Sequence, residues 1–331
     1  MIRRRLVLAW WTLVGVVVLL GGLGDATVWL RDREDQPGPL PEARTIVVPH
    51  GGIDQLAATL HDTGLIDSRL QFRLAVWISR RDGPLHAAEF AFPQHASLYQ
   101  VLAVLRTARP VQHHVTIAEG LSAQQIAGVI NHIDAATGEV PPPDEGSVLP
   151  QTYDYEYGTA RAAILGRAQA AMAHELAADW AGRAPDVPLE SPHDALVLAS
   201  IVERETARPD ERPHVAAVYL NRLQAGMRLQ ADPTVVYAAS GGSGLLDHRL
   251  TRSDLERDHP YNTYRRAGLP PGPICAPGRA SLLAVLHPAH SDDLYFVADG
   301  SGGHVFARTL ETHERNVARW RALGPAHGGV D

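Results

Sequence analysis

Two carboxylates follow the most apolar helix that the sequence predicts. Residues 195–202 are apolar except for Ser200, and Glu203 and Glu205 come directly after them, where we expect the helix to end. Burial and the negative end of the helix dipole both disfavour ionisation there, so a carboxyl can keep its proton near neutral pH. A protonated carboxyl of this kind can act as a general acid toward a glycosidic oxygen.

The two glutamates cannot share this chemistry. They are two residues apart, about 200° around a helix, so they cannot face one site while the helix persists. One is therefore the candidate acid and the other is structural. Arg204 and Arg208 would lower the pKa of a nearby carboxyl. From these residues alone, a solvated helix end with Glu–Arg pairs is the favoured interpretation.

The elements that position these carboxylates are expected to be helices first and short strands afterwards. We predict helices over about 160–181, from Pro192 to Arg208 at the latest, and over about 213–225. Short strands are predicted at 294–297 and 304–306, around a glycine-rich turn. The sequence thus predicts an α+β catalytic domain with a helical core over residues 148–324, followed by a tail at 325–331.

The preceding part of the chain repeats a pattern of strand, turn and amphipathic helix. It occurs at residues 45–60, 89–105 and 114–130. Units of this size resemble LysM-type peptidoglycan-binding modules, with an ordinary α+β domain as the alternative. We predict a LysM-like strand-turn-helix domain over 44–136. Three consecutive prolines cannot continue a helix, so residues 137–147 are predicted to be a linker.

The amino terminus predicts the compartment. Residues 6–24 form 19 consecutive positions without a charge, close to the ~20 that cross a bilayer, and Arg3, Arg4 and Arg5 precede them. We predict a cytoplasmic tip and transmembrane anchor over 1–30, a proline-rich stalk over 31–43, and an extracytoplasmic remainder at the inner (plasma) membrane. A cleaved signal peptide is the alternative.

Composition excludes several classes of protein. A formal net charge of -7 argues against nucleic-acid binding. The one cysteine, Cys275, cannot form an intramolecular disulfide. Although there are 17 histidines, no His-Glu-x-x-His motif occurs, and neither does the Gly-x-Ser-x-Gly motif of serine hydrolases. We therefore expect no metal and no cofactor.

Several motifs together resemble the YceG-like family of endolytic murein transglycosylases. They include Leu198-Ala-Ser-Ile-Val-Glu203-Arg-Glu205-Thr206, Gly226-Met-Arg-Leu-Gln230-Ala-Asp232-Pro233-Thr234 and Tyr261-Asn-Thr-Tyr264. The resemblance runs from the predicted anchor to about Trp320. Departures, such as Gln151 where the family usually has Asp, lie outside the Glu-x-Glu-Thr core.

The resemblance implies an enzyme that cuts peptidoglycan glycan strands internally, between N-acetylmuramic acid and N-acetylglucosamine, and leaves 1,6-anhydro-muramic acid ends. It assigns catalysis to Glu205, with Glu203 as the alternative. Substrate-binding candidates are Asn221, Gln230, Asp232, Thr234, Tyr261, Asn262 and Tyr264. The family implies penicillin-binding synthases as partners. Two other functions stay open, a membrane-tethered glycan-binding scaffold without catalysis and a lysozyme-like hydrolase, which a carboxylate at Asp232 would favour.

Overall fold

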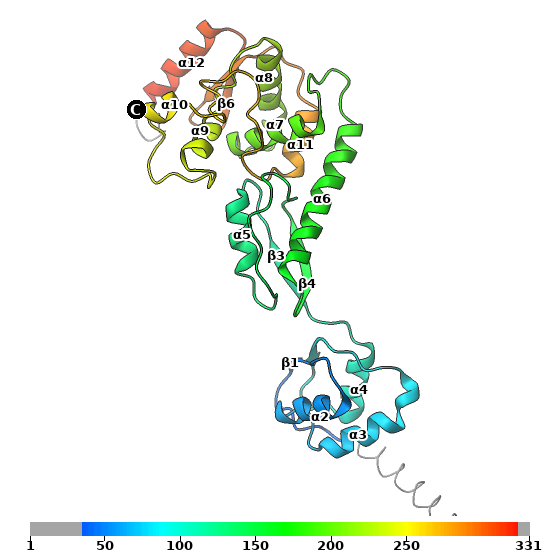
Figure 1. Ribbon diagram of the computed structural model, residues 1–331. Helices are drawn as coiled ribbons and strands as arrows, with labels where there is room; N and C mark the ends of the chain where they lie inside the picture. Colours follow the sequence, from blue (N-terminus) through cyan, green and yellow to red (C-terminus); the bar gives the residue numbers. More distant parts are fainter. Residues whose placement is uncertain (1–34, 324–331) are drawn as a thin grey trace, which may run out of the picture. The chain divides into compact units, whose positions relative to one another are not determined.

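A computed structural model describes residues 35–323 of this mixed α/β protein. That part holds eleven α-helices and three two-stranded sheets, which confirms the predicted mixture of helices and short strands (Figure 1). Contacts divide the chain into two compact units, Met1–His113 and His114–Asp331. No helix in the described residues is long and apolar enough to cross a bilayer. The predicted anchor and tail, residues 1–30 and 325–331, lie outside the described part.

The first unit packs two short strands and their helices around its own apolar core. Its elements are β1 (Arg44–Val47), α2 (Ile53–Asp62), α3 (Arg69–Ile78), the 3-10 helix η1 (Arg80–Asp82), β2 (Glu89–Phe92) and α4 (Leu98–Thr107). The strands pair antiparallel, with Ile46 opposite Phe90. Phe72 of α3 and Phe92 of β2 lie in the same buried cluster. The first two predicted strand-turn-helix segments therefore form their sheet with each other.

The third predicted segment belongs to the second unit, which begins at His114, whereas the predicted strand-turn-helix domain continues to residue 136. Its strand β3 (Gln112–Thr116) pairs with β4 (Thr152–Glu156). In Figure 1, α5 (Ala123–Asn131) and α6 (Arg161–Ala181) lie on either side of this strand pair. Val115, Ile126 and Ile164 fill the core between them.

The predicted linker is a packed part of the second unit. The Asn131 side chain donates to the carbonyl of Val140 at 2.9 Å and accepts from its amide at 3.0 Å. The Arg161 guanidinium donates to the carbonyls of Ile130, Ile133 and Gly138. Prolines exclude a helix here, as predicted, but side-chain donors supply the hydrogen bonds that a helix would have made. Composition alone does not reveal such partners.

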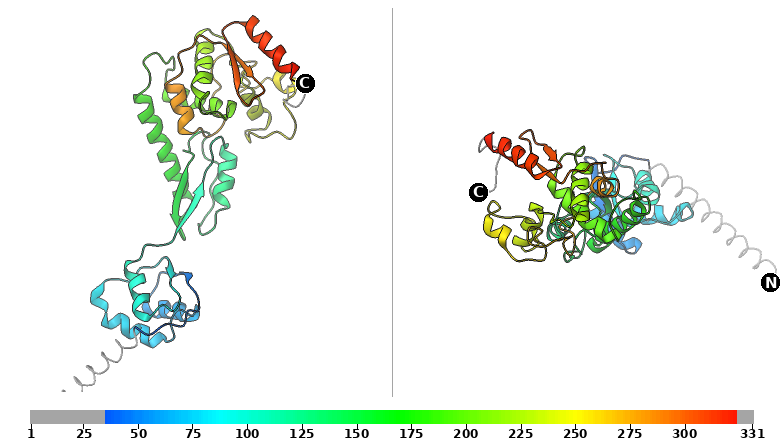
Figure 2. Two further views of the ribbon diagram at one scale, coloured as in Figure 1. Left: turned by 180° about the vertical axis from the view of Figure 1, so that it is seen from behind. Right: turned by 90° about the horizontal axis from the view of Figure 1, so that it is seen from above.

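The rest of the second unit is built around four helices. These are α6, α7 (Pro192–Glu205), α8 (Arg212–Gln224) and α11 (Arg279–Leu286), which share one buried apolar cluster. The remaining elements are α9 (Asp232–Ala239), α10 (Arg252–Glu256), β5 (Tyr295–Ala298), β6 (His304–Ala307) and α12 (Leu310–Ala322). β5 and β6 form an antiparallel hairpin, and α12 contacts it (Figure 2). All three predicted helices and both predicted strands are present, within a few residues of the expected bounds.

Candidate active site

Helix α7 carries the two glutamates to the edge of the helical core. Ser191 caps it by accepting from the Asp194 amide at 3.2 Å, and Pro192 occupies its first turn. Every residue from 195 to 202 is buried, so the helix lies inside the unit along most of its length. It ends at Glu205, because Thr206 has extended backbone angles. Glu205 is therefore the point at which the buried helix reaches the surface.

The Glu205 carboxyl is shielded from water. Its Oε2 atom has no contact with solvent and no hydrogen-bond partner, although the residue as a whole is partly exposed. This burial raises the pKa of the carboxyl to about 7, and the charge of Asp232 acts in the same direction, whereas a hydrogen bond from Tyr219 and the Arg222 guanidinium lower it. A carboxyl with this pKa can give a proton and take one back near neutral pH.

The side chains that act on Glu205 come from two other helices and a loop. Tyr219 and Arg222 lie on α8, and Asp232 is the first residue of α9. Tyr264 follows α10, and its hydroxyl donates to Oδ1 of Asp232 at 2.5 Å. Burial raises the pKa of Tyr264, as does the Asp232 charge, so this hydroxyl remains a hydrogen-bond donor.

Glu203 is tied into the protein on both carboxylate oxygens. Its side chain is 5% exposed, Oε1 accepts from Arg212 at 3.0 Å, and Oε2 accepts from the amide of Gly278 at 2.8 Å. Arg212 is buried as well, so this ion pair joins α7 to α8 and to the start of α11. Neither oxygen of Glu203 lacks a partner, in contrast to Glu205.

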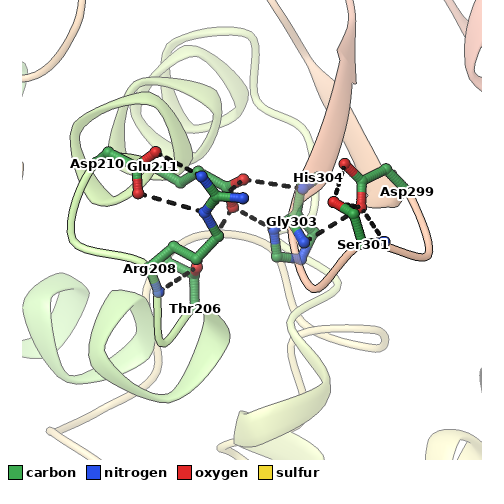
Figure 3. A network of polar contacts seen from close by, with 8 residues as sticks. All are labelled: Thr206, Arg208, Asp210, Glu211, Asp299, Ser301, Gly303 and His304. Carbon is green, nitrogen blue, oxygen red and sulfur yellow. Dashed lines mark hydrogen bonds and ion pairs between the residues drawn. The ribbon is translucent and has the colours of Figure 1, made fainter.

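The arginines near these glutamates have other partners. Arg204 donates to the carbonyls of Gly120 and Gly244. Arg208 pairs with Asp210 at 2.8 Å and lies 3.6 Å from Glu211 (Figure 3). Neither arginine is among the charges that set the pKa of Glu205. The pKa-lowering effect considered from the sequence is therefore absent, and the solvated Glu–Arg helix end is not what the structure shows.

A polar network fixes the chain that follows Glu205 (Figure 3). Both oxygens of Glu211 accept from His304, one from its amide at 3.0 Å and the other from Nδ1 at 2.7 Å. Thr206 donates to the same carboxylate at 3.4 Å. The His304 ring meets Phe296 edge-on at 5.3 Å, and Phe296 meets Tyr219 edge-on at 5.8 Å. The β5–β6 hairpin thus contacts the neighbours of Glu205 on two sides.

Three predicted substrate-binding residues use side-chain donors to bond the protein's own main chain. Thr234 and Asn262 are fully buried. Thr234 donates to the carbonyl of Ala231 at 2.7 Å, and Asn262 donates to three main-chain carbonyls between α10 and the loop that follows it. The Asn221 amide bonds two carbonyls of the segment before β5. These donors are occupied within the protein, as those of turn and cap residues are.

The other four candidates keep exposed surface, and two of them lie beside Glu205. Asp232 and Tyr264 belong to the group of charges and hydroxyls around its carboxyl. Gln230 is exposed and has a φ of 50°, a left-handed conformation that a non-glycine residue rarely adopts outside turns and functional sites. Tyr261 packs instead against Tyr237, with ring centroids 4.9 Å apart.

Sequence reasoning missed Tyr219 and Arg222. Both are buried on α8, in a stretch whose apolar spacing is that of a core-facing helix. A buried tyrosine needs a partner for its hydroxyl, and a buried arginine needs partners for five N–H groups. This need for partners could have marked both residues as candidates for a polar site. Only the fold shows that Tyr219 bonds Glu205 and that Arg222 bonds the carbonyls of Leu229 and Leu294.

Comparison with known proteins gives consistent matches. A sequence profile of the YceG-like family matches residues 46–319. The chain is 27% identical to the endolytic murein transglycosylase of Streptococcus pneumoniae serotype 2 (strain D39 / NCTC 7466), over 83% of this chain and 58% of that protein. It is 46% identical over 125 residues to the endolytic murein transglycosylase of Bacillus subtilis (strain 168), which is 38% of this chain and 34% of that protein.

A solved structure agrees with these matches. The crystal structure of a yceG-like protein from Listeria monocytogenes aligns with a TM-score of 0.51 at 28% identity, covering 83% of this chain and 99% of that one. The chain spans about three-fifths or less of the curated relatives' own length. The profile match nevertheless extends from β1 into α12, through both units and the Glu205 site. This chain therefore belongs to the YceG-like family.

Proposed function

We propose that this chain is an endolytic murein transglycosylase that cuts peptidoglycan glycan strands between N-acetylmuramic acid and N-acetylglucosamine without adding water. The Glu205 carboxyl carries this proposal. It is partly buried at a helix end, has an unpartnered oxygen, and has a pKa of about 7. The names of the relatives support the same reaction class.

One carboxyl is sufficient for this reaction. Protonated Glu205 gives its proton to the glycosidic oxygen as the bond to C1 of the muramoyl sugar breaks. The resulting carboxylate then accepts the proton of the muramoyl C6 hydroxyl, whose oxygen bonds to C1 and closes the 1,6-anhydro ring. The proton that Glu205 loses in the first step is recovered in the second. We propose that cleavage of nascent strands in this way terminates their elongation.

Asp232 supports a second candidate, a lysozyme-like hydrolase. Its carboxylate is close enough to Glu205 to raise the pKa of Glu205. A second carboxylate near the acid could activate water or form an ester. The hydroxyl of Tyr264 donates to Oδ1 of Asp232 at 2.5 Å. We favour the transglycosylase because the curated relatives carry that name.

Mass spectrometry of the products tests the proposal. The protein is incubated with uncrosslinked glycan strands, and the new ends are identified by mass. We expect internal cuts whose products end in 1,6-anhydro-muramic acid, 18 mass units (roughly one water) lighter than hydrolysed ends. Ends that carry the added water would establish the hydrolase. Strands that remain uncut would exclude both enzymes, and a glycan-binding scaffold would be the remaining function.

The pH dependence of the rate reports the protonation of Glu205. With a pKa of about 7, the acid form predominates below that pH, so we expect the rate to fall about tenfold per pH unit well above it. In Tyr219→Phe the hydrogen bond that lowers this pKa is lost, so the alkaline limb should move to higher pH. The rate at pH 6 should fall by about tenfold or less.

Tyr261→Phe is the matched control for this measurement. Its hydroxyl is also partly buried, but it is not among the groups that set the pKa of Glu205. We expect the pH at which its rate begins to fall to match that of the wild type, whatever its absolute rate. An unchanged alkaline limb in Tyr219→Phe, or an equal shift in both variants, would contradict the assignment of that limb to Glu205.

We infer that the first unit is the LysM-like, peptidoglycan-binding part of the enzyme. A cavity of about 510 Å³ lies within this unit, between the β1–α2 loop and the segment before β2. Pro49, His50, Pro84 and His86 line it, together with Arg106. A concave site with apolar walls and a few polar groups suits a sugar.

We also propose that the chain is a single-pass protein of the inner (plasma) membrane, with a cytoplasmic amino terminus and an extracytoplasmic catalytic unit. The support is the uncharged run at residues 6–24 behind three arginines. In that position the enzyme would meet newly made glycan strands and the penicillin-binding synthases that produce them. Protease accessibility of the second unit in intact spheroplasts is the direct measurement.

A further inference from the structure

Helix α3 of the first unit is apolar on two opposite faces. Phe72, Ala75 and Val76 pack into the core of the unit. Leu70, Leu74, Trp77 and Ile78 face outward, with exposed fractions of 63%, 41%, 59% and 38%. The described residues contain thirteen large apolar side chains that are exposed, and four of them lie on this one ten-residue helix. Such clustering marks an interaction surface.

The outward residues form one continuous stripe, which we call the α3 stripe: Leu70, Leu74, Trp77 and Ile78. At about 100° per residue they lie within roughly 100° of arc, directly opposite the core-facing residues. A helix that is apolar on both faces needs a second apolar environment. No residue of the described part of the first unit, 35–113, covers the stripe.

Basic groups lie along one flank and beyond the end of the stripe. Arg69 and Arg73 are paired with Asp62 and Asp54 at 2.6 and 2.9 Å. The Arg80 guanidinium lies 4.8 Å above the Trp77 ring, and Arg81 follows it. An apolar stripe that contains a tryptophan and is bordered by arginine is the pattern of helices that lie in the membrane–water interface.

The chain keeps this helix within reach of a bilayer. The uncharged run ends at Gly24, and Leu40, sixteen residues later, is already buried in the core of the first unit. At no more than about 3.5 Å per residue, this connection cannot exceed about 55 Å. If the predicted anchor spans the membrane, the first unit must stay close to the bilayer surface.

We propose that the α3 stripe docks on the phospholipid surface of the membrane, with its four apolar side chains at the acyl–headgroup boundary and Arg80 and Arg81 among anionic headgroups. This surface is independent of the Glu205 chemistry. Docking would hold the first unit on the membrane surface by a contact of its own, in addition to the predicted anchor.

A lipid-quenching experiment on the full chain tests this surface. The chain is reconstituted in phosphatidylglycerol-containing vesicles with a fluorescent probe on Leu74→Cys, and quenching by nitroxide-labelled lipid is measured. Ala91→Cys is the matched control, because Ala91 is exposed on β2 between the core residues Phe90 and Phe92 and is not part of the α3 stripe. The native Cys275 is buried and does not compete for the label.

We expect strong quenching at position 74 and little at position 91. Arg80→Glu with Arg81→Glu should weaken docking on anionic vesicles, by roughly fivefold or more per arginine, and change little on zwitterionic ones. Equal, weak quenching at both positions would overturn the proposal. The proposal would also be overturned if the probe at position 74 became shielded from solvent as protein or glycan was added, but not as lipid was added. Shielding by added protein would assign the stripe to a second copy of the chain, and shielding by added glycan would assign it to a saccharide.

Discussion

Glu205→Gln should lose transglycosylase activity by roughly a thousandfold or more. General acid–base catalysis contributes about 10² to 10⁴ in rate, and here one carboxyl supplies both the acid and the base. The amide of Gln has nearly the same shape but can neither give a proton to the glycosidic oxygen nor accept one from the C6 hydroxyl. The measurement is the rate of formation of 1,6-anhydro ends at pH 6.

The same variant should be at least as stable as the wild type. The native carboxyl has a pKa of about 7 against 4.5 for an ordinary glutamate, so the folded state binds more protons between these two values. Wild-type stability therefore falls as the pH rises from 4.5 to 7, by at most roughly 3 kcal/mol. The Gln variant lacks this penalty, and at pH 8 it should unfold at equal or higher urea concentration.

Glu256→Gln is the matched control. Glu256 ends helix α10, as Glu205 ends α7, but it is exposed and pairs with Arg252. It should change neither the rate nor the stability. Normal formation of anhydro ends by Glu205→Gln would refute the catalytic assignment. Loss of activity together with unfolding would show instead that Glu205 is structural.

Glu203→Ala should destabilise the second unit by about 3 to 5 kcal/mol. The substitution leaves the buried Arg212 without its partner at 3.0 Å and the Gly278 amide without its acceptor. Glu119, 3.7 Å from Arg212 and half-exposed, can compensate only in part. Urea unfolding followed by the fluorescence of Trp180, which packs against the affected core, measures the change.

Glu256→Ala breaks an ion pair whose two side chains are 86% and 62% exposed, so it should cost about 0.5 kcal/mol or less. This contrast separates the two candidate acids. A Glu203→Ala variant that is as stable as the wild type but inactive would make Glu203 the catalytic residue. A variant that is destabilised, yet forms anhydro ends in proportion to its folded fraction, agrees with the structure.

Local structure could be predicted because its causes are local. Helix α7 is limited at both ends by local signals. Ser191 caps its start and is followed by Pro192, and the apolar run extends to Val202, with Pro209 beyond the helix. The alternation of strand, turn and helix likewise located β1, β2 and β3. Their pairing could not be predicted, because similar segments can pair with one another equally well. β1 pairs with β2, whereas β3 pairs with β4 in the other unit.

The sequence by itself determined that a carboxyl stands at the end of a buried helix, in a motif that resembles one known family. It could not decide which of Glu203 and Glu205 has a carboxyl oxygen that is left without a partner. That depends on the groups that the fold brings to each oxygen. Both oxygens of Glu203 accept hydrogen bonds, from Arg212 and from the Gly278 amide, whereas burial and Asp232 oppose charge on Glu205. The pKa of a carboxyl depends on its exposure to water and on charged and hydrogen-bonding groups within a few ångströms of it. Only the tertiary structure fixes the distances to those groups.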